Sequence, residues 1–502
     1  MFWLLLIVAC LVWVMNSKLE NRKIVELSRK LPGDLPSWPI LGHAYLLRGS
    51  DEDQMKVFQK SGRLTINRGG LASYWVANRL YIMVADPVAA EVILKKCLDK
   101  DYVMKFLQFL VGNGSIYAPV SIWRPRRKLI APTFSMKNLN RFVEVFARQS
   151  AVMVDQIGSS AGRGTFSVWK FLTTYTFDAV CETTLGVQMR AQLSPNQAFL
   201  DALEEITQLV ATRMVQPWLY ADCVYSLLPQ YRNLLLIFKY SLKILIHLLF
   251  QVIKTKRMEM EQRAKTNSQQ DPEVFSPQSF LEMLLESSQL TDHELAEEAM
   301  VISVAGTDTS AVAASFTVLM LSRHPEVQDR VYEELCEVLG DSNRDMTAED
   351  LPRLKYLEAV IRETLRLYPP VPIIVRSVEQ DTDLPSGLTL VKGVGIVINI
   401  WATHRNPRYW GSDADVFRPE RFLEPLKHPA QFMPFSYGLR NCLGYQYAMM
   451  SIKTVLASLF RKYRALPPEG ADQTTLKEPL RLKFDIMMKD VHKFQIQLES
   501  RL

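Results

Sequence analysis

Apolar residues recur at helical spacing over most of this chain, and short polar stretches separate these segments. The spacing predicts helices at residues 137–158, 168–185, 197–215, 231–264, 291–322, 325–339, 354–368 and 443–463. Shorter apolar runs predict strands at residues 72–84, 373–376, 388–400 and 482–498. The pattern therefore predicts a mainly α fold with a minor β region.

The helix predicted at residues 291–322 contains no proline and should pass through the protein interior. It begins with a capping box, in which the side chains of Thr291 and Glu294 bond each other's backbone N–H groups. From Ser310 onward it is apolar on nearly every side, which is typical of a buried helix.

The middle of this helix carries residues that are costly there. Gly306 is less favourable than alanine in a helix interior by about 1 kcal/mol, and Asp308 and Thr309 need polar partners if they are buried. Two interpretations are open. Either these residues serve chemistry, or the Thr309 hydroxyl bonds to the carbonyl one turn earlier in a kinked helix.

The first residues of the chain predict a membrane anchor. Residues 1–15 carry no charged side chain, a run slightly shorter than the roughly 20 residues that span a bilayer. Positive charges follow it, at Lys18, Arg22, Lys23, Arg29 and Lys30, and the positive-inside rule keeps them in the cytosol. We therefore expect an anchor at 1–17 and a basic, proline-rich linker at 18–42.

The remaining residues, 43–502, are expected to form one domain on the cytosolic side. No glycine-, serine- or proline-rich break divides them. The six cysteines are widely spaced without a C-x-x-C pair, which favours a reducing compartment. A net charge of +6 is too small to indicate nucleic-acid binding, and it suits an anionic partner or a membrane surface.

The strongest candidate for chemistry is the segment that begins at Phe435. In it, Cys442 lies between Gly438 and Gly444 and two residues after Arg440. A cysteine thiolate can be an axial ligand of haem iron. The glycines let backbone come close to a flat cofactor, and nearby amides can bond the sulfur. The alternative, a buried cysteine in a glycine-rich loop, fits this pattern poorly.

This segment resembles the haem-binding signature of the cytochromes P450, and the central helix is similar to the oxygen-activating helix of that family. The resemblance covers nearly the whole chain and implies the haem-thiolate fold. It implies haem b, non-covalent apart from the iron–thiolate bond of Cys442. It also implies that Ala305 and Gly306 leave a groove for dioxygen, and that Asp308 and Thr309 relay protons.

A further match involves charged residues. Glu363 and Arg366 lie one helical turn apart, a spacing that is nearly uninformative by itself. In the family that the chain resembles, this pair joins a later arginine, here Arg421, in a buried charge network with a structural role. Arg418 is the alternative third member.

The resemblance also implies cationic and aromatic residues around the haem propionates, namely Trp123, Arg127, Arg376 and Arg440. Trp123 and Arg127 share a helix face, and Pro125 between them is tolerated if that helix begins near residue 122. For any one of these arginines, a solvated surface charge is the alternative.

Arg124, Arg126, Lys128 and Arg440 are expected to contribute to a basic face for an acidic flavoprotein. The implied partner is NADPH–cytochrome P450 reductase, and cytochrome b5 is a second candidate electron donor. The alternative is that such a face only keeps the protein soluble. The implied location is the endoplasmic reticulum membrane, as in microsomal members.

Residues 177–183 and 399–407 are similar to the insect members of the group that includes fatty-acid ω-hydroxylases. Many of that group carry glutamate where this chain has Ala305, so covalent haem attachment is not expected. The implied reaction inserts one oxygen atom from dioxygen into a lipophilic substrate, which could be a fatty-acid-like lipid, a hormone, an odorant or pheromone, or a xenobiotic. The mostly apolar pocket should draw on residues 103–120, 208–225, 300–305, 371–374 and 488–492.

Two other functions share the cysteine signature. Some relatives of this fold rearrange peroxides without a reductase, but they usually lack the acid–alcohol pair that Asp308 and Thr309 would form. A non-catalytic haem-thiolate binding protein would have no need of a proton relay.

Overall fold

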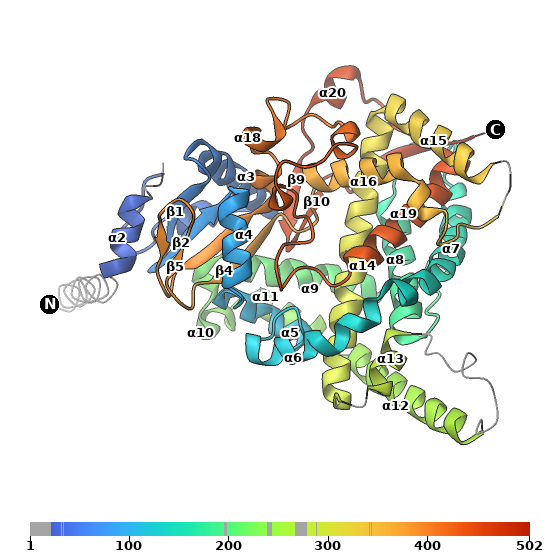
Figure 1. The fold of residues 1–502 in the computed structure, drawn as a ribbon, viewed down its shortest axis with the longest axis horizontal. Helices are drawn as coiled ribbons and strands as arrows, with labels where there is room; N and C mark the ends of the chain where they lie inside the picture. Colours follow the sequence, from blue (N-terminus) through green and yellow to red (C-terminus); the bar gives the residue numbers. More distant parts are fainter. Residues whose placement is uncertain are drawn as a thin grey trace.

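The computed structural model describes residues 22–31, 33, 35–194, 198–237, 243–266, 279–287, 289–340, 342 and 344–501. It is mainly helical with a minor β region (Figure 1), as the sequence pattern predicts. The longer helices are α2 (Arg22–Lys30), α3 (Asp51–Asn67), α4 (Pro87–Lys96), α6 (Val120–Ile130), α7 (Met136–Gly158), α8 (Trp169–Leu185), α9 (Ala198–Val215), α11 (Pro229–Ile237), α12 (Lys243–Thr266), α14 (Asp292–Arg323), α15 (Pro325–Leu339), α16 (Lys355–Leu367) and α19 (Tyr445–Lys462).

The larger sheet has four strands, in the order β1 (Leu71–Val76), β2 (Arg79–Val84), β7 (Gly395–Asn399) and β4 (Ile373–Ser377). β2 and β7 run parallel, and the other neighbours are antiparallel. Ile82 of β2 and Ile396 of β7 pack with Ile93 and Leu94 of α4 in one apolar cluster. The sheet and α2 occupy the left side of Figure 1, and the helical body occupies the right.

Smaller sheets are built mostly from the C-terminal residues. β3 (Phe166–Ser167), β11 (Gln495–Ser500) and β8 (Tyr463–Leu466) form one of them, β5 (Thr382–Asp383) and β6 (Thr389–Leu390) another. β9 (Leu482–Asp485) and β10 (Met487–Asp490) form a tight antiparallel hairpin. Ile486 joins these two strands with a φ of 68°, a conformation that costs a β-branched residue energy.

Helix α14, yellow in Figure 1, passes through the helical body and packs against α8, α16 and α19. Its predicted capping box is present, since Thr291 N–H donates to Glu294 Oε2 at 2.9 Å and Glu294 N–H donates to Thr291 Oγ1 at 3.3 Å. Within the described part of the chain, α14 alone is long and apolar enough to cross a membrane, but 83% of its apolar stretch is buried inside the protein. It is a core helix, as predicted.

The structure corrects several predicted elements. Residues 72–84 form a hairpin, because Ala77 has a φ of 51° between β1 and β2. Helices α3 and α4 were not predicted, although Ser50 and Asp86 cap their first turns. The helix predicted at 231–264 corresponds to α11 and α12, and residues 238–242 between them lie outside the description. The predicted anchor at 1–17 also lies outside the described residues, and α2 occupies part of the predicted linker.

Candidate functional site

Cys442 lies in a loop that leads directly into α19. Its backbone N–H donates to the carbonyl of Phe435 at 2.8 Å and so closes the loop. Gly438 has a φ of 74°, and a Cβ at this position would lie 2.5 Å from the carbonyl oxygen of Leu94 in α4. Gly444 precedes α19 as its N-cap, and a Cβ there would lie 3.9 Å from Cys442 Sγ. Gly438 therefore shapes the loop, whereas Gly444 leaves space beside the sulfur.

The surroundings of Cys442 act on its thiolate in opposite directions. Burial raises the pKa of the Cys442 thiol, while the backbone N–H of Gly444 and the charge of Arg127 act to lower that pKa. The N-terminus of α19 adds a positive potential at this position. The side chain is nevertheless accessible. A metal ion deprotonates a coordinating thiol outright, so this loop can present a thiolate ligand to a metal.

Arg376 of β4 is a buried cation that has no acidic partner among the residues that the structure describes. Its side chain is 1% exposed, and its Nη1 donates to the carbonyl of Val375 at 2.9 Å. Its Nε has no hydrogen-bond partner in the same described segments. Burial lowers the pKa of Arg376 to about 10, and the nearby charge of Arg440 adds to this effect. An anion at this position would offset both the burial of the Arg376 charge and its repulsion by Arg440.

Arg440 links the cysteine loop to two distant segments. Its Nη1 donates to the carbonyl of Leu98 at 3.0 Å, and its Nη2 donates to the carbonyl of Ala118 at 2.6 Å. Its guanidinium carbon lies 4.6 Å from the centre of the buried Trp123 ring, a favourable cation–π distance. Burial lowers the pKa of Arg440 to about 10, with the charge of Arg127 also contributing.

Lys100 is a third cation in this group, and the sequence did not reveal it. Burial, together with the charges of Arg376 and Arg440, holds the pKa of Lys100 well below its ordinary value. Within the described residues, no carboxylate forms an ion pair with any of these three cations. Lys100 stands in a short polar stretch after α4, where a lysine ordinarily indicates a solvated loop, and its neighbours in space come from remote parts of the chain.

Helix α6 begins at Val120 rather than near residue 122, so Pro125 lies within the helix and not in its first turn. Trp123 is buried, as the resemblance implies. Arg127 donates to the backbone oxygen of Asn441 at 2.9 Å and to its Oδ1 at 2.8 Å. Its described hydrogen bonds therefore tie α6 to the residue before Cys442.

The expectation that Arg126 and Arg440 lie on an exposed basic face is wrong. Each is 6% exposed. Arg126 Nη1 lies 2.9 Å from Glu297 Oε2 and 3.2 Å from Glu298 Oε1, both on α14. The acidic first turns of α14 draw this arginine inward, and only Arg124 and Lys128 of the expected face are exposed.

In the middle of α14, the Thr309 hydroxyl donates to the carbonyl of Ala305 at 2.6 Å. This is the back-bonded conformation that the sequence left open, and the oxygen of that hydroxyl can still accept a hydrogen bond. Gly306 faces α8, where a Cβ would lie 3.0 Å from Val180 Cγ2. The close packing of α14 on α8 therefore explains why a residue without a side chain stands at position 306.

Asp308 has a basic partner that the sequence did not connect with it. Lys489 Nζ lies 3.2 Å from Asp308 Oδ2 and 3.4 Å from Asp485 Oδ2. All three residues are buried. Among the described hydrogen bonds, none joins Asp308 to Thr309, because the Asp308 carboxylate is directed toward β10.

The predicted charge network is present. Arg366 donates to Glu363 through Nε and Nη2, both at 2.7 Å. Arg421 Nε lies 3.5 Å from Glu363 Oε1. Arg418 is excluded as the third charge, since its side chain is exposed and pairs with Asp413, although its backbone N–H donates to Glu363.

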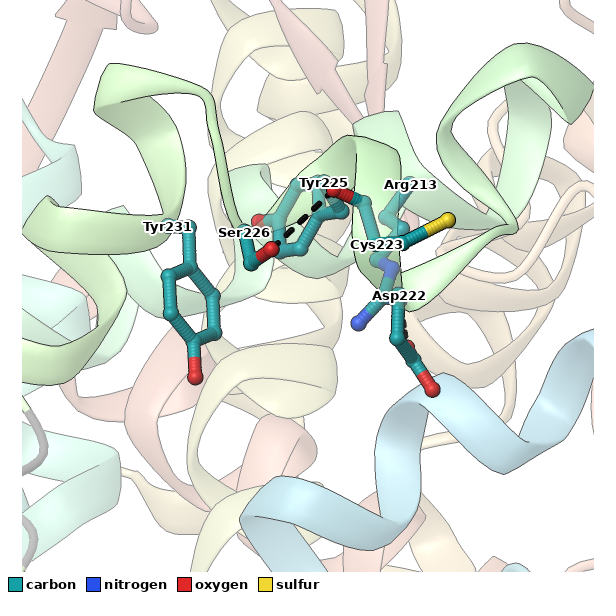
Figure 2. Close-up of a pocket in the computed structure, with 6 residues that line it drawn as sticks. All are labelled: Arg213, Asp222, Cys223, Tyr225, Ser226 and Tyr231. Atoms are coloured by element: carbon teal, nitrogen blue, oxygen red, sulfur yellow. Dashed lines mark hydrogen bonds and ion pairs between the residues drawn. The ribbon is translucent and has the colours of Figure 1, made fainter.

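A separate pocket of about 330 Å³ lies among α9, α10 (Asp222–Tyr225) and α11 (Figure 2). Arg213 and Asp222 point toward each other in it and form an ion pair. Its lining residues are Arg213, Asp222, Cys223, Tyr225, Ser226 and Tyr231. Four of them fall within the range 208–225 that was expected to line the substrate pocket, but they are more polar than expected.

The residues around Cys442 fit a flat iron cofactor with two carboxylates. The accessible sulfur suits a metal that prefers a soft ligand. Arg376 Nε is buried without an acceptor, and Lys100 and Arg440 have no ion-pair partner among the described residues. Two propionate groups would supply the missing negative charge.

The cytochrome P450 family model matches residues 32–492. Cytochrome P450 4d2 of Drosophila melanogaster is 33% identical over 87% of this chain and 89% of its own length. Cytochrome P450 4V2 of Mus musculus is 30% identical over 94% of this chain and 90% of its own, and cytochrome P450 4c21 of Blattella germanica is 29% identical over 99% and 98%. The chain therefore belongs to the cytochrome P450 family of haem-thiolate monooxygenases.

Proposed function

We propose that this monooxygenase inserts one oxygen atom of dioxygen into a lipophilic substrate, with electrons that NADPH supplies through a flavoprotein reductase. The observation that carries the proposal is the exposed Cys442 in one loop with Arg440. Arg440 lies beside Arg376 and Lys100, two cations without an ion-pair partner in the described part of the chain. The apolar cluster that joins Val304, next to Ala305, to Phe106 and Val210 supports a lipophilic substrate.

The cofactor is haem b, bound through Cys442 and otherwise without covalent bonds, since Ala305 offers no carboxylate. When it is bound, haem supplies the oxygen-activating redox chemistry. Arg376, Arg440, Lys100 and Trp123 hold its propionate side, and Arg127 fixes the cysteine loop through Asn441. Phe435, Gly438 and Gly444 shape that loop.

Asp308 and Thr309 are the proposed catalytic residues, and Ala305 leaves room beside them for dioxygen, whereas Gly306 faces α8. The Thr309 hydroxyl is anchored on the Ala305 carbonyl, so its oxygen is held in a fixed place where it can accept a proton and pass one on. Asp308 is the residue next to Thr309 in α14, and a solvent proton taken up by its carboxylate would replace the proton that the hydroxyl gives away.

Residues 1–17 are proposed to anchor the protein in the endoplasmic reticulum membrane, with the domain 43–502 in the cytosol. Exposed apolar side chains at Trp38, Ile40 and Leu41 support contact with a lipid surface just after the anchor. NADPH–cytochrome P450 reductase is the proposed electron donor, and cytochrome b5 is the second candidate.

The decisive experiment begins with the purified, reduced and CO-bound protein. Its Soret band should have the red-shifted position of a thiolate ligand, and Cys442→His should move the band to the position of imidazole-ligated haem. Incubation with reductase, NADPH, oxygen and a panel of lipids and xenobiotics should then give oxygenated product. An unchanged band in the variant would contradict the ligand, and turnover of a lipid peroxide without reductase would favour a rearrangement instead.

A further inference from the structure

The β9–β10 hairpin places a buried ionic cluster against α14. Lys489 is 3% exposed, Asp485 is not exposed, and Asp308 is 6% exposed. Lys489 Nζ stands between the two acids, 3.2 Å from Asp308 and 3.4 Å from Asp485, and 4.9 Å from the centre of the Trp169 ring. Within the described part of the chain, neither carboxyl oxygen of Asp485 has a hydrogen-bond partner. Such an acid is costly to bury in its charged form.

The surrounding charges do not neutralise this cluster. Lys483 Nζ lies 3.8 Å from Asp485 but also 3.9 Å from Asp51 of α3, so its charge is divided. Glu204 of α9 adds a further negative charge that acts on both Asp485 and Lys489. If every group is ionised, Lys489 is shared between two buried carboxylates.

The turn of the hairpin fixes this arrangement. Ile486 alone separates Asp485 from its cross-strand neighbour Met487, and its φ of 68° is unfavourable for a β-branched side chain. Ile486 packs against both large apolar clusters of the protein. Strain of this kind persists where the surroundings over-determine the backbone, and it is common at functional sites.

We propose that Lys489 is a positioning residue that holds the Asp308 carboxylate on the β10 side of α14, and that Asp485 is the exchangeable acid that sets how firmly Lys489 holds it. This inference rests on the proposed role of Asp308 in proton delivery. It places the control of that acid in the β9–β10 hairpin.

The protonation of Asp485 is what changes near neutral pH. Burial raises the pKa of Asp485 to about 7, and the charge of Asp308 adds to this effect while Lys489 opposes it. Burial lowers the pKa of Lys489, but the charges of Asp308 and Asp485 outweigh burial and raise it above its ordinary value. Lys489 therefore stays charged, and Asp485 is the member of this cluster whose protonation changes.

The two protonation states differ in how Lys489 is used. When Asp485 is protonated, the cluster contains one ammonium and one carboxylate, and Lys489 pairs with Asp308 alone. When Asp485 ionises, the two acids compete for Lys489, and Asp308 is held less firmly. The fraction of electrons that ends in product should therefore depend on pH through Asp485.

The test uses the holoenzyme reconstituted with reductase, and it compares Lys489→Met with Lys489→Arg. NADPH consumption, hydrogen peroxide release and product are measured together. Lys489→Met should raise the ratio of hydrogen peroxide to product by about tenfold, which is a modest part of the rate factor that side-chain proton transfer contributes. Lys489→Arg keeps the positive charge and should return the ratio most of the way to its wild-type value. The matched control is Lys453→Met, which removes a buried lysine of α19 that lies 3.0 Å from Glu358 of α16. It should leave the ratio unchanged.

A second measurement does not depend on turnover. Infrared spectra of the resting protein with ¹³C-labelled aspartate should show a carboxylic acid band that titrates near pH 7. The band should be absent in Asp485→Asn and should titrate at higher pH in Lys489→Met, where the opposing cation is gone. The hydrogen peroxide ratio should vary with pH in the wild-type protein and not in Asp485→Asn.

An unchanged ratio in Lys489→Met, or equal changes in it and Lys453→Met, would overturn the positioning role. Absence of the titrating band would overturn the role of Asp485. If the wild-type protein consumes no NADPH, the proposed function fails, and the infrared titration still decides whether Asp485 exchanges a proton with this cluster.

Discussion

Arg366 donates two hydrogen bonds of 2.7 Å to Glu363 one turn away on α16, and neither side chain is exposed. The remaining three guanidinium hydrogens reach the carbonyls of His404 at 2.8 Å, Ala414 at 2.5 Å and Val416 at 3.1 Å. Burying such a pair gains little by itself, but removing one member leaves a charge in the interior without a partner. α16 is thereby held to the segment that precedes the cysteine loop.

Glu363→Leu should consequently lower the free energy of unfolding by about 3–5 kcal/mol, because the charge of Arg366 remains buried. Urea unfolding of the purified protein, followed by circular dichroism, measures the change. Arg418→Ala is the control, since its exposed side chain pairs with the partly exposed Asp413. It should shift stability by less than about 0.5 kcal/mol. Equal losses in the two variants would contradict a buried network.

The two glycines of the cysteine loop should respond differently to alanine. Gly438→Ala places a Cβ 2.5 Å from the Leu94 carbonyl oxygen at a φ of 74°, so the loop must move and haem occupancy should fall severely. Gly444→Ala meets nothing closer than 3.9 Å and has a φ of −83°, so occupancy should be nearly retained. The ratio of haem absorbance to protein after purification checks both variants. A greater loss in Gly444→Ala would reverse the roles assigned to these glycines.

Close packing of α14 on α8 predicts compensation between two residues. Gly306→Ala should loosen this contact, because its Cβ would lie 3.0 Å from Val180 Cγ2, and overpacking of this kind costs about 1–3 kcal/mol. Val180→Ala removes the conflicting methyl groups, so the double variant should be more stable than the sum of the single changes. Thermal unfolding of the four proteins gives the coupling. Simple additivity would mean that Gly306 serves the cofactor side of the helix.

The sequence was most informative where the interactions are local. The capping box at Thr291 and the pairing of Glu363 with Arg366 are contained within single helical turns, and the structure has both. The cysteine loop was recognisable because its glycines, Arg440 and Cys442 lie within a few residues of one another.

Long-range pairing could not be derived in this way. Arg126 appeared to be a surface cation, because its partners Glu297 and Glu298 belong to a helix far along the chain. The partner of Asp308 was missed for the same reason, since Lys489 reaches α14 only through the β9–β10 hairpin. A pattern of residue types records which groups need partners but not which distant segment provides them.

The cations near the cysteine loop should strengthen haem binding and lower the stability of the cofactor-free protein. Arg376→Met removes a buried charge whose pKa is lowered to about 10, so the apoprotein should be as stable as the wild type or more stable. The holoprotein should lose haem to apomyoglobin about tenfold faster, consistent with the roughly 1.5–3 kcal/mol of a hydrogen bond to a charged group. Lys100→Met should act in the same direction.

Arg124→Met, which removes an exposed cation of α6, is the control for this comparison. It should change neither the stability of the apoprotein nor the rate of haem loss. If Arg376→Met weakens both forms of the protein, Arg376 has a structural role and is not a propionate ligand.

Stability should depend on pH through Asp350, which accepts hydrogen bonds from Arg344 Nη1 at 2.6 Å and Nη2 at 2.7 Å. These hydrogen bonds hold the pKa of Asp350 far below its ordinary value of 3.8. The unfolded chain therefore binds the proton more readily, so this contribution is present above that ordinary value and is lost as the pH falls. Arg344→Gln should thus destabilise the protein at pH 7, and the difference from wild type should shrink below about pH 4. Arg353→Gln is the control, because it removes an exposed arginine 3.8 Å from the same carboxylate, and it should have a much smaller effect. The measurement is the denaturation midpoint of the wild type and of the two variants at both pH values. A difference for Arg344→Gln that widens on acidification would mean that the pairing with Asp350 is not its source.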